Sequence, residues 1–250
     1  MRILDESALG FPNARVPGPA RNEEPGRRVH RSLLEQGLAT AEGQVLGELD
    51  LIRSTLTWAI EAARTGDEEI TREVVARVEE ARRRYAEAHD GLLAVIARQS
   101  PVAGDLRLAM ALLHVNDRAE RMAVQCVDIA TLRSAMSDGQ GLSRGQLDCL
   151  SEMARLAEEQ IGQARRAFAD RDLDAASRLR DHDLAINAHN RSCFALAVEE
   201  GVDEARREAA FFGVLMARAI ERIGDNAVDI GHQLNFAVTG RLRAASPSSR

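Results

Sequence analysis

The sequence of 250 residues contains no lysine and few aromatic side chains. Aromatic residues make up 3% of the chain, with one Trp, one Tyr and six Phe. A β-sandwich usually carries more aromatic and β-branched residues, so this composition favours a helix bundle with a core of Leu, Ala, Val, Ile and Met. The 33 basic residues are all arginine, against 39 acidic residues. The net charge of −6 argues against a generic nucleic-acid-binding protein, which would carry a basic surface.

Cysteines are also sparse, and long apolar runs are missing. Cys126, Cys149 and Cys193 form no Cys-x-x-Cys pair. This odd count argues against a disulfide scaffold or a zinc ribbon and favours a reducing compartment. No apolar run reaches the roughly 18 residues of a membrane-spanning helix, and the first residues lack the apolar segment of a secretory signal. We therefore expect a cytoplasmic protein that meets a membrane only through its partners.

Prolines are confined to a few places along the chain. Four of the six lie in the first 25 residues, one is Pro101, and one is near the C-terminus. Because proline inside a helix costs about 3 kcal/mol, the two long proline-free stretches are predicted to be helical. Ser100 is expected to cap the third helix, and Ser143 with Gln146 to form a capping box at the fourth. The predicted helices span residues 30–64, 68–98, 100–134, 143–169, 173–199 and 203–238.

The six predicted helices fall into two similar sets of three. A Glu-Arg-apolar element followed by Val-Asp-Ile occurs at 120–129 in the third helix and at 221–230 in the sixth, 101 residues apart. An internal duplication of a three-helix unit explains this recurrence. The predicted parts are a disordered extension at 1–28, a first repeat at 29–136, a second repeat at 143–239 and a flexible tail at 240–250.

The sixth predicted helix carries an acidic row. Glu221, Asp225 and Asp229 are spaced four residues apart, so they share one face of the helix, with His232 one turn further on. Stacked carboxylates repel one another, and either nearby arginines or a bound cation relieves that repulsion. The sequence leaves both interpretations open, a salt-bridged surface or a metal site. Asp183 on the fifth helix is a candidate to face this row.

The corresponding row of the third helix is weaker. Glu120 and Asp128 match the first and last acids of the row, but Val124 takes the place of the middle one. Asp117, one turn before Glu120, is the available substitute. Because ligands of oxygen alone suit Mg, Mn, Ca or Fe, we predict binding of a divalent or iron-type ion, stronger in the second repeat.

Signs of an active site are missing from the sequence. None of the six histidines follows a glutamate at i+3, so the Glu-x-x-His pairs of di-iron bundles are absent. A phosphate-binding loop of the Gly-x-x-x-x-Gly-Lys type is excluded because there is no lysine. Cys126 and Cys193 lie within predicted helices and are expected in the core rather than as nucleophiles. None of these common catalytic or nucleotide-binding motifs is therefore present in the sequence.

Three stretches resemble the PhoU family of phosphate-uptake regulators. They are Gln-Ser-Pro-Val-Ala-Gly-Asp-Leu-Arg at 99–107, Glu-Arg-Met at 120–122, and Glu-Arg-Ile-Gly-Asp-Asn-Ala-Val-Asp-Ile at 221–230. The resemblance covers about residues 30 to 238. It implies an all-α fold of two tandem three-helix bundles related by a pseudo-twofold axis, with metal-binding Glu/Asp-x-x-x-Asp motifs. That motif is complete at Glu221 and Asp225, and only Glu120 matches it in the first repeat.

The resemblance also implies a function without catalysis. It indicates a cytoplasmic adaptor, expected as a homodimer, that restrains the phosphate ABC transporter and its sensor histidine kinase when phosphate is plentiful. The expected partners are the ATPase subunit of that transporter and the membrane kinase. Two other interpretations remain open from the residues. One is a metal-dependent helical enzyme or metal-storage bundle that uses the acidic row, and the other is a helical scaffold without metal.

Overall fold

The computed structural model describes residues 25–137 and 141–241. Within these ranges the chain forms helices only, and no strand is present. The prediction of an all-α fold with six helices is therefore confirmed, whereas the predictions for residues 1–24 and 242–250 concern residues outside these ranges. The helices are α1 (Pro25–Thr65), α2 (Glu68–Gln99), α3 (Ala103–Ser134), α4 (Arg144–Asp170), α5 (Leu173–Glu200) and α6 (Glu204–Thr239).

Two helix ends differ from the prediction. Helix α1 begins at Pro25, so residues 25–28 do not belong to a disordered extension. Proline is well suited to the first helical turn, where its missing N–H needs no partner. Ser100 does not cap α3 but ends α2, with a left-handed φ of 44° and its N–H donating to the Ile96 carbonyl. The chain then enters α3 after Val102, which makes no side-chain cap.

The start of α4 agrees with the prediction. The Ser143 hydroxyl accepts a hydrogen bond from the Gln146 N–H, and the Gln146 side chain accepts one from the Ser143 N–H. These reciprocal bonds satisfy two N–H groups that would otherwise lack partners in the first turn. The capping box therefore fixes where the second repeat begins.

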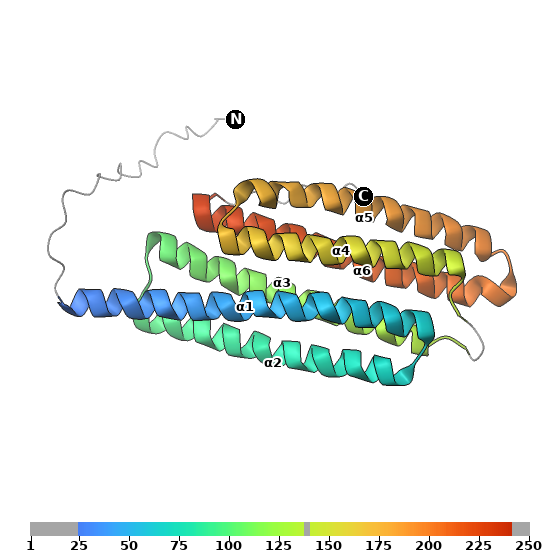
Figure 1. The fold of residues 1–250 in the computed structure, drawn as a ribbon, viewed down its shortest axis with the longest axis horizontal. Helices are drawn as coiled ribbons and strands as arrows, with labels where there is room; N and C mark the ends of the chain where they lie inside the picture. Colours follow the sequence, from blue (N-terminus) through green and yellow to red (C-terminus); the bar gives the residue numbers. More distant parts are fainter. Residues whose placement is uncertain (1–24, 138–140, 242–250) are drawn as a thin grey trace, which may run out of the picture.

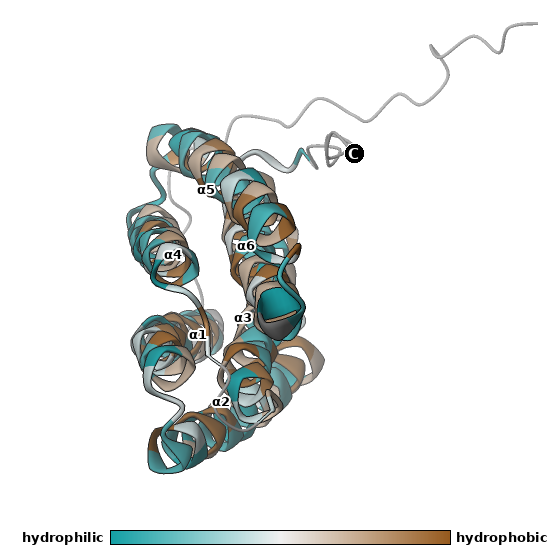
Figure 2. Ribbon diagram, turned by 90° about the vertical axis from the view of Figure 1, so that its right-hand side faces the viewer, coloured by the Kyte–Doolittle hydropathy of each residue, from teal (hydrophilic) through white to brown (hydrophobic). Residues whose placement is uncertain are grey.

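The helices form two three-helix bundles that pack side by side. Helices α1–α3 make the first bundle and α4–α6 the second, and α3 lies along α6 in the middle (Figure 1). In the orthogonal view α1 and α4 line one side and α3 and α6 the other, with α2 and α5 at opposite ends (Figure 2). One continuous cluster of buried Ala, Leu, Ile, Val and Met side chains runs through both bundles. Small residues such as alanine allow close helix approach, which explains how so few aromatic residues suffice.

Ion pairs tie the two bundles together. Arg171 donates two hydrogen bonds to the Glu42 carboxylate, at 2.6 and 2.7 Å, and Arg165 donates to Asp50 at 2.7 Å. Thr57 of α1 donates to Glu158 of α4 at 2.8 Å. These polar contacts lie along the α1–α4 side, and α3 packs against α6 on the other side.

Two cysteines that are far apart in the sequence meet in the second bundle. Cys149 of α4 and Cys193 of α5 form a disulfide, with their Cα atoms 6.1 Å apart. The odd cysteine count argued against a disulfide scaffold, and nothing in the sequence indicated this pair, because the two positions lie 44 apart on opposite sides of the α4–α5 turn. Cys126 is a free, buried thiol in α3. Of the helices described, none has the length and hydropathy needed to cross a bilayer.

Candidate functional site

Helix α6 presents the acidic row because its opposite face is buried. Ile223, Ala227 and Ile230 have no exposed surface, as their spacing predicts. Consequently Asp225 is exposed on the surface, and Glu221 and Asp229 are partly exposed. All three carboxylates lie on the outward side of α6, but they do not share one environment.

Asp229 is compensated by cationic groups of the protein. Its carboxylate lies 3.3 Å from Arg118 Nε of α3 and 3.4 Å from His232 Nδ1. The hydrogen bond from His232 and the charge of Arg118 outweigh burial and hold the pKa of Asp229 below its ordinary value. Since Arg118 comes from the first repeat, this contact also links the two repeats. Asp229 is therefore directed towards α3 rather than towards the other acids.

Glu221 and Asp225 instead face Asp183 of α5. Burial, followed by the charges of Asp225 and Glu221, raises the pKa of Asp183 to about 6. The pKa of Asp225 is raised as well, by burial and by the charges of Glu221 and Asp229. Gly224 lets α5 and α6 approach here, because a Cβ atom at that position would come within 3.0 Å of Ile186 Cδ1 and of Gln160 Oε1. The carboxylates of Asp183, Glu221 and Asp225 thus repel one another where α5 meets α6. We call these three residues the Asp183 cluster.

Arginines offset the charge of the Asp183 cluster only in part: Arg180 lowers the pKa of Asp183 and Arg218 that of Asp225, but burial and the other carboxylates raise both pKa values more. Arg218 forms an ion pair with Glu221, and Asn187 donates to Asp183 Oδ2 at 3.0 Å. The other oxygen, Asp183 Oδ1, is buried and has no hydrogen-bond partner among the described residues. A buried acceptor without a partner is unfavourable unless a further ligand reaches it.

Two of the acids predicted in the first repeat, Glu120 and Asp117, lie beside arginine side chains. Glu120 lies 4.0 Å from Arg82 Nε of α2. Asp117 lies 3.9 Å from Arg121 and accepts a hydrogen bond from the Tyr85 hydroxyl at 3.4 Å. Asp128 lies two turns beyond Glu120 on α3. These arginines offset the charges of Glu120 and Asp117 in part, as Arg218 offsets that of Glu221, and a weaker metal site in the first repeat stays a prediction.

The structure reveals one buried acid that the sequence analysis missed. Glu48 of α1 is 0% exposed, and neither of its carboxylate oxygens has a hydrogen-bond partner among the described residues. Burial and the nearby charge of Glu120 raise its pKa to about 8, although Arg84 opposes them. Glu48 lies between Val45 and Leu49 on the apolar stripe of α1, and that position was the signal available in the sequence.

The carboxylates of the Asp183 cluster are suitable ligands for a cation, although they do not have the geometry of a preformed metal site. Within residues 25–137 and 141–241, no three His, Cys, Asp or Glu side chains have the geometry of a metal site. However, Asp183, Glu221 and Asp225 provide oxygen ligands only, with one buried oxygen unpaired and two pKa values raised by burial and by mutual repulsion. Hard divalent cations prefer such ligands.

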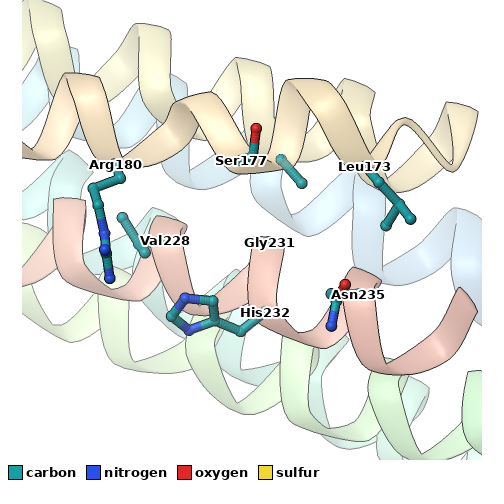
Figure 3. A pocket seen from close by; sticks show the side chains of 8 residues that line it. Leu173, Ser177, Arg180, Val228, Gly231, His232 and Asn235 are labelled. Atoms are coloured by element: carbon teal, nitrogen blue, oxygen red, sulfur yellow. The ribbon is translucent and has the colours of Figure 1, made fainter. Parts of the chain in front are cut away.

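A small pocket lies next to the acidic row, between α5 and α6. It has a volume of about 200 Å³. Arg180 extends from α5 towards α6, and His232 projects from α6 beside it (Figure 3). Gly231 forms part of the wall, because a Cβ atom there would come within 2.8 Å of Leu179 Cδ1. The remaining lining residues are Leu173, Ala176, Ser177, Val228 and Asn235.

Comparisons with known proteins agree with this architecture. The family model of the PhoU domain matches residues 46–132 and 150–234, one match in each three-helix bundle. The phosphate-specific transport system accessory protein PhoU homolog 1 of Mycobacterium tuberculosis is 29% identical over 216 residues, which cover 85% of this chain and 96% of that protein. The homolog 1 of Thermotoga maritima is 27% identical over 210 residues, covering 83% and 89%. These are names of accessory proteins rather than enzymes, in agreement with the prediction of no enzymatic activity.

Two crystal structures share the fold. PhoU from Streptococcus pneumoniae superposes with a TM-score of 0.77 at 18% identity, covering 85% of this chain and all of that one. PhoU from Pseudomonas aeruginosa gives the same TM-score at 19% identity, covering 83% and 99%. The family model matches well over half of the 250 residues, in two copies that correspond to the two bundles. The chain therefore belongs to the PhoU family.

Proposed function

We propose that this chain is a cytoplasmic regulator that restrains phosphate uptake and phosphate-responsive signalling when phosphate is plentiful. The observation that carries the proposal is the match to the PhoU domain in both repeats, together with relatives named as accessory proteins of phosphate-specific transport. The partners proposed are the ATPase subunit of the phosphate ABC transporter and a membrane sensor histidine kinase. A homodimer is the proposed assembly.

We further propose that a divalent or iron-type cation binds at the Asp183 cluster. Asp183, Glu221 and Asp225 are the proposed ligands, and Asn187 orients Asp183 through its hydrogen bond. A bound cation would neutralise the repulsion among these carboxylates and join α5 to α6. Asp229 is expected to contribute less to cation binding than the sequence indicated, because Arg118 and His232 already lie beside its carboxylate.

The exposure of the acids favours an adaptor over a metal-dependent enzyme or metal store. A catalytic or storage site is expected to enclose its ligands in a closed, dry pocket. Asp225 is exposed, and Asp183 and Glu221 are partly exposed, so the Asp183 cluster opens to solvent. A cation at this position is suited to a structural or sensing role at the surface.

Loss of the protein is expected to leave phosphate-starvation genes switched on in phosphate-rich medium. The reason is that the restraint on the transporter and the kinase would be missing. The measurement is expression of a phosphate-starvation reporter in a strain from which every PhoU-family gene has been deleted, because a second copy would mask the effect. A deletion strain that still silences the reporter in high phosphate would contradict the adaptor proposal.

A further inference from the structure

Helix α5 buries few of its residues, as α2 does. In its 28 residues only Leu179, Ile186, Cys193 and Ala197 are buried, whereas α4 buries eleven residues in 27. The first three are seven residues apart, so they form a single narrow row along the helix. A helix held by one row depends strongly on each contact in that row.

The two halves of α5 are attached to α4 in different ways. In the N-terminal half, the amide groups of Gln163 and Gln160 donate to the carbonyls of Ala175 and Leu179, at 2.9 and 3.0 Å. In the C-terminal half, the attachment to α4 is the disulfide between Cys149 and Cys193, beside the buried Met153. The disulfide therefore occupies the third position of the anchoring row.

We infer that Cys149 and Cys193 form a reversible thiol–disulfide site that controls how firmly α5 is held against α4. Their Cα separation of 6.1 Å lies within the range that a disulfide spans without backbone movement. The two cysteines also differ in exposure, since Cys149 is partly exposed while Cys193 is 3% exposed. This difference assigns the attacking role to Cys149 and the resolving role to Cys193.

The oxidant assigned to this site is a small-molecule disulfide of the glutathione disulfide class. The Cys149 thiolate attacks one sulfur of the oxidant and expels one small thiolate, forming a mixed disulfide. The Cys193 thiolate then attacks the Cys149 sulfur and expels the second small thiolate. The two protons lost by the protein thiols go to the two released thiolates. Two electrons pass to the oxidant, and excess reduced thiol reverses both steps.

The third cysteine provides an internal contrast. Cys126 lies in α3, fully buried, and burial raises the pKa of its thiol to about 12. Such a thiol forms little thiolate, and unlike Cys193, which is also buried but lies against Cys149, it is not paired with another cysteine. Replacement of Cys126 is therefore a matched control for replacement of Cys149.

The position of α5 also affects cation binding at the Asp183 cluster, and this consequence rests on the proposed function. Asp183 lies between the two attachments of α5, after Leu179 and before Cys193. Oxidation that holds α5 in place keeps Asp183 beside Glu221 and Asp225. Cation affinity is therefore expected to be about tenfold higher in the oxidised protein than in the reduced protein, comparable to the effect of residues that orient metal ligands.

The test uses the full chain in glutathione buffers of increasing oxidised fraction. Alkylation and mass spectrometry report the state of each cysteine, and hydrogen exchange reports the protection of α5. Oxidation is expected to link Cys149 to Cys193 and to slow amide exchange in residues 180–200 by about tenfold, with α2 unchanged. Cys126→Ala is expected to behave as the natural chain, and Cys149→Ser to show α5 exchange at the reduced rate in every buffer.

Two results would overturn the inference. One is that both cysteines of the folded protein remain open to alkylation in excess glutathione disulfide. The other is that α5 exchanges equally fast in the oxidised and reduced states. Titration with Mn²⁺ separates this inference from the cation proposal. If α5 protection follows the redox state while no Mn²⁺ binds in either state, the redox site stands and the cation proposal fails.

Discussion

Replacing Glu48 with glutamine is expected to stabilise the protein by several kcal/mol at pH 9 and to change its stability little near pH 4.5. The Glu48 side chain is 0% exposed, and neither oxygen has a hydrogen-bond partner among the described residues. Ionisation therefore places in the first bundle, next to Glu120, a buried charge that Arg84 offsets only in part. Glutamine has nearly the same shape and carries no charge.

The sign of the pH dependence follows from the raised pKa. The pKa of Glu48 rises from 4.5 in the unfolded chain to about 8 in the folded protein. Between these values the folded protein keeps a proton that the unfolded chain has released, so the free energy of unfolding falls as the pH rises. At about 1.4 kcal/mol per pH unit, the full loss between pH 4.5 and pH 8 is on the order of 5 kcal/mol. Above pH 8 the loss is complete.

Urea unfolding at a series of pH values between 4.5 and 9, with EDTA present, measures this effect. The difference in unfolding free energy between Glu48→Gln and the natural chain is expected to grow steadily up to about pH 8. Glu35→Gln on the same helix is the control, because Glu35 is exposed and pairs only with Arg31 at 3.0 Å in the contacts described. Its effect is expected to stay within about 0.5 kcal/mol at every pH. A pH-independent difference for Glu48→Gln would contradict the prediction.

Replacing Asp225 with alanine is expected to weaken cation binding about tenfold or more, whereas Asp128→Ala is expected to change it less than about twofold. Asp225 lies in the Asp183 cluster, where burial and mutual repulsion raise two carboxylate pKa values. Asp128 lies in the first repeat, where Arg82 faces Glu120 and Arg121 faces Asp117. Removal of Asp128 therefore takes away no ligand of the stronger site.

Titration with Mn²⁺ and elemental analysis of the purified protein provide the measurement. Asp225→Asn separates the loss of negative charge from the loss of side-chain volume, and its cation affinity is expected to fall as well. Two outcomes would show that the site is misplaced. They are equal losses in Asp225→Ala and Asp128→Ala, or full metal content in a variant with both Glu221 and Asp225 replaced by alanine.

The fold was largely predictable because local signals determine it. Proline placement, the capping box at Ser143 and the glycines at helix ends are read within a few residues of the chain. The errors arose where local signals conflict. Pro25 reads equally as the end of an irregular segment and as the first residue of a helix. Ser100 before Pro101 resembles an N-cap, yet its backbone completes the preceding helix instead.

The candidate site was predictable only within one helix. The spacing of Glu221, Asp225 and Asp229 placed them on one face of α6, and the burial of Ile223 and Ala227 confirms that orientation. Spacing does not specify what packs against that face from another helix. Helix packing alone brings Arg118 to Asp229, across the boundary between the repeats.

The same limit applies to contacts between α4 and α5. Cys149 and Cys193 lie 44 positions apart, and their contact depends on the register of two antiparallel helices. Glu48 differs, because a glutamate on an apolar stripe is visible in the sequence. Its full burial was nevertheless not predictable, since many such residues reach solvent through a flexible side chain.

Co-purification with the transport and signalling proteins tests the regulatory role most directly. The full chain is immobilised and exposed to the ATPase subunit of the phosphate ABC transporter and, separately, to the cytoplasmic part of the sensor histidine kinase, both from the same organism. An ATPase subunit of an unrelated transporter from that organism serves as the control. The regulatory role predicts that the phosphate transporter subunit or the kinase is retained and that the control subunit is not. Retention of neither, or equal retention of the control subunit, would contradict it.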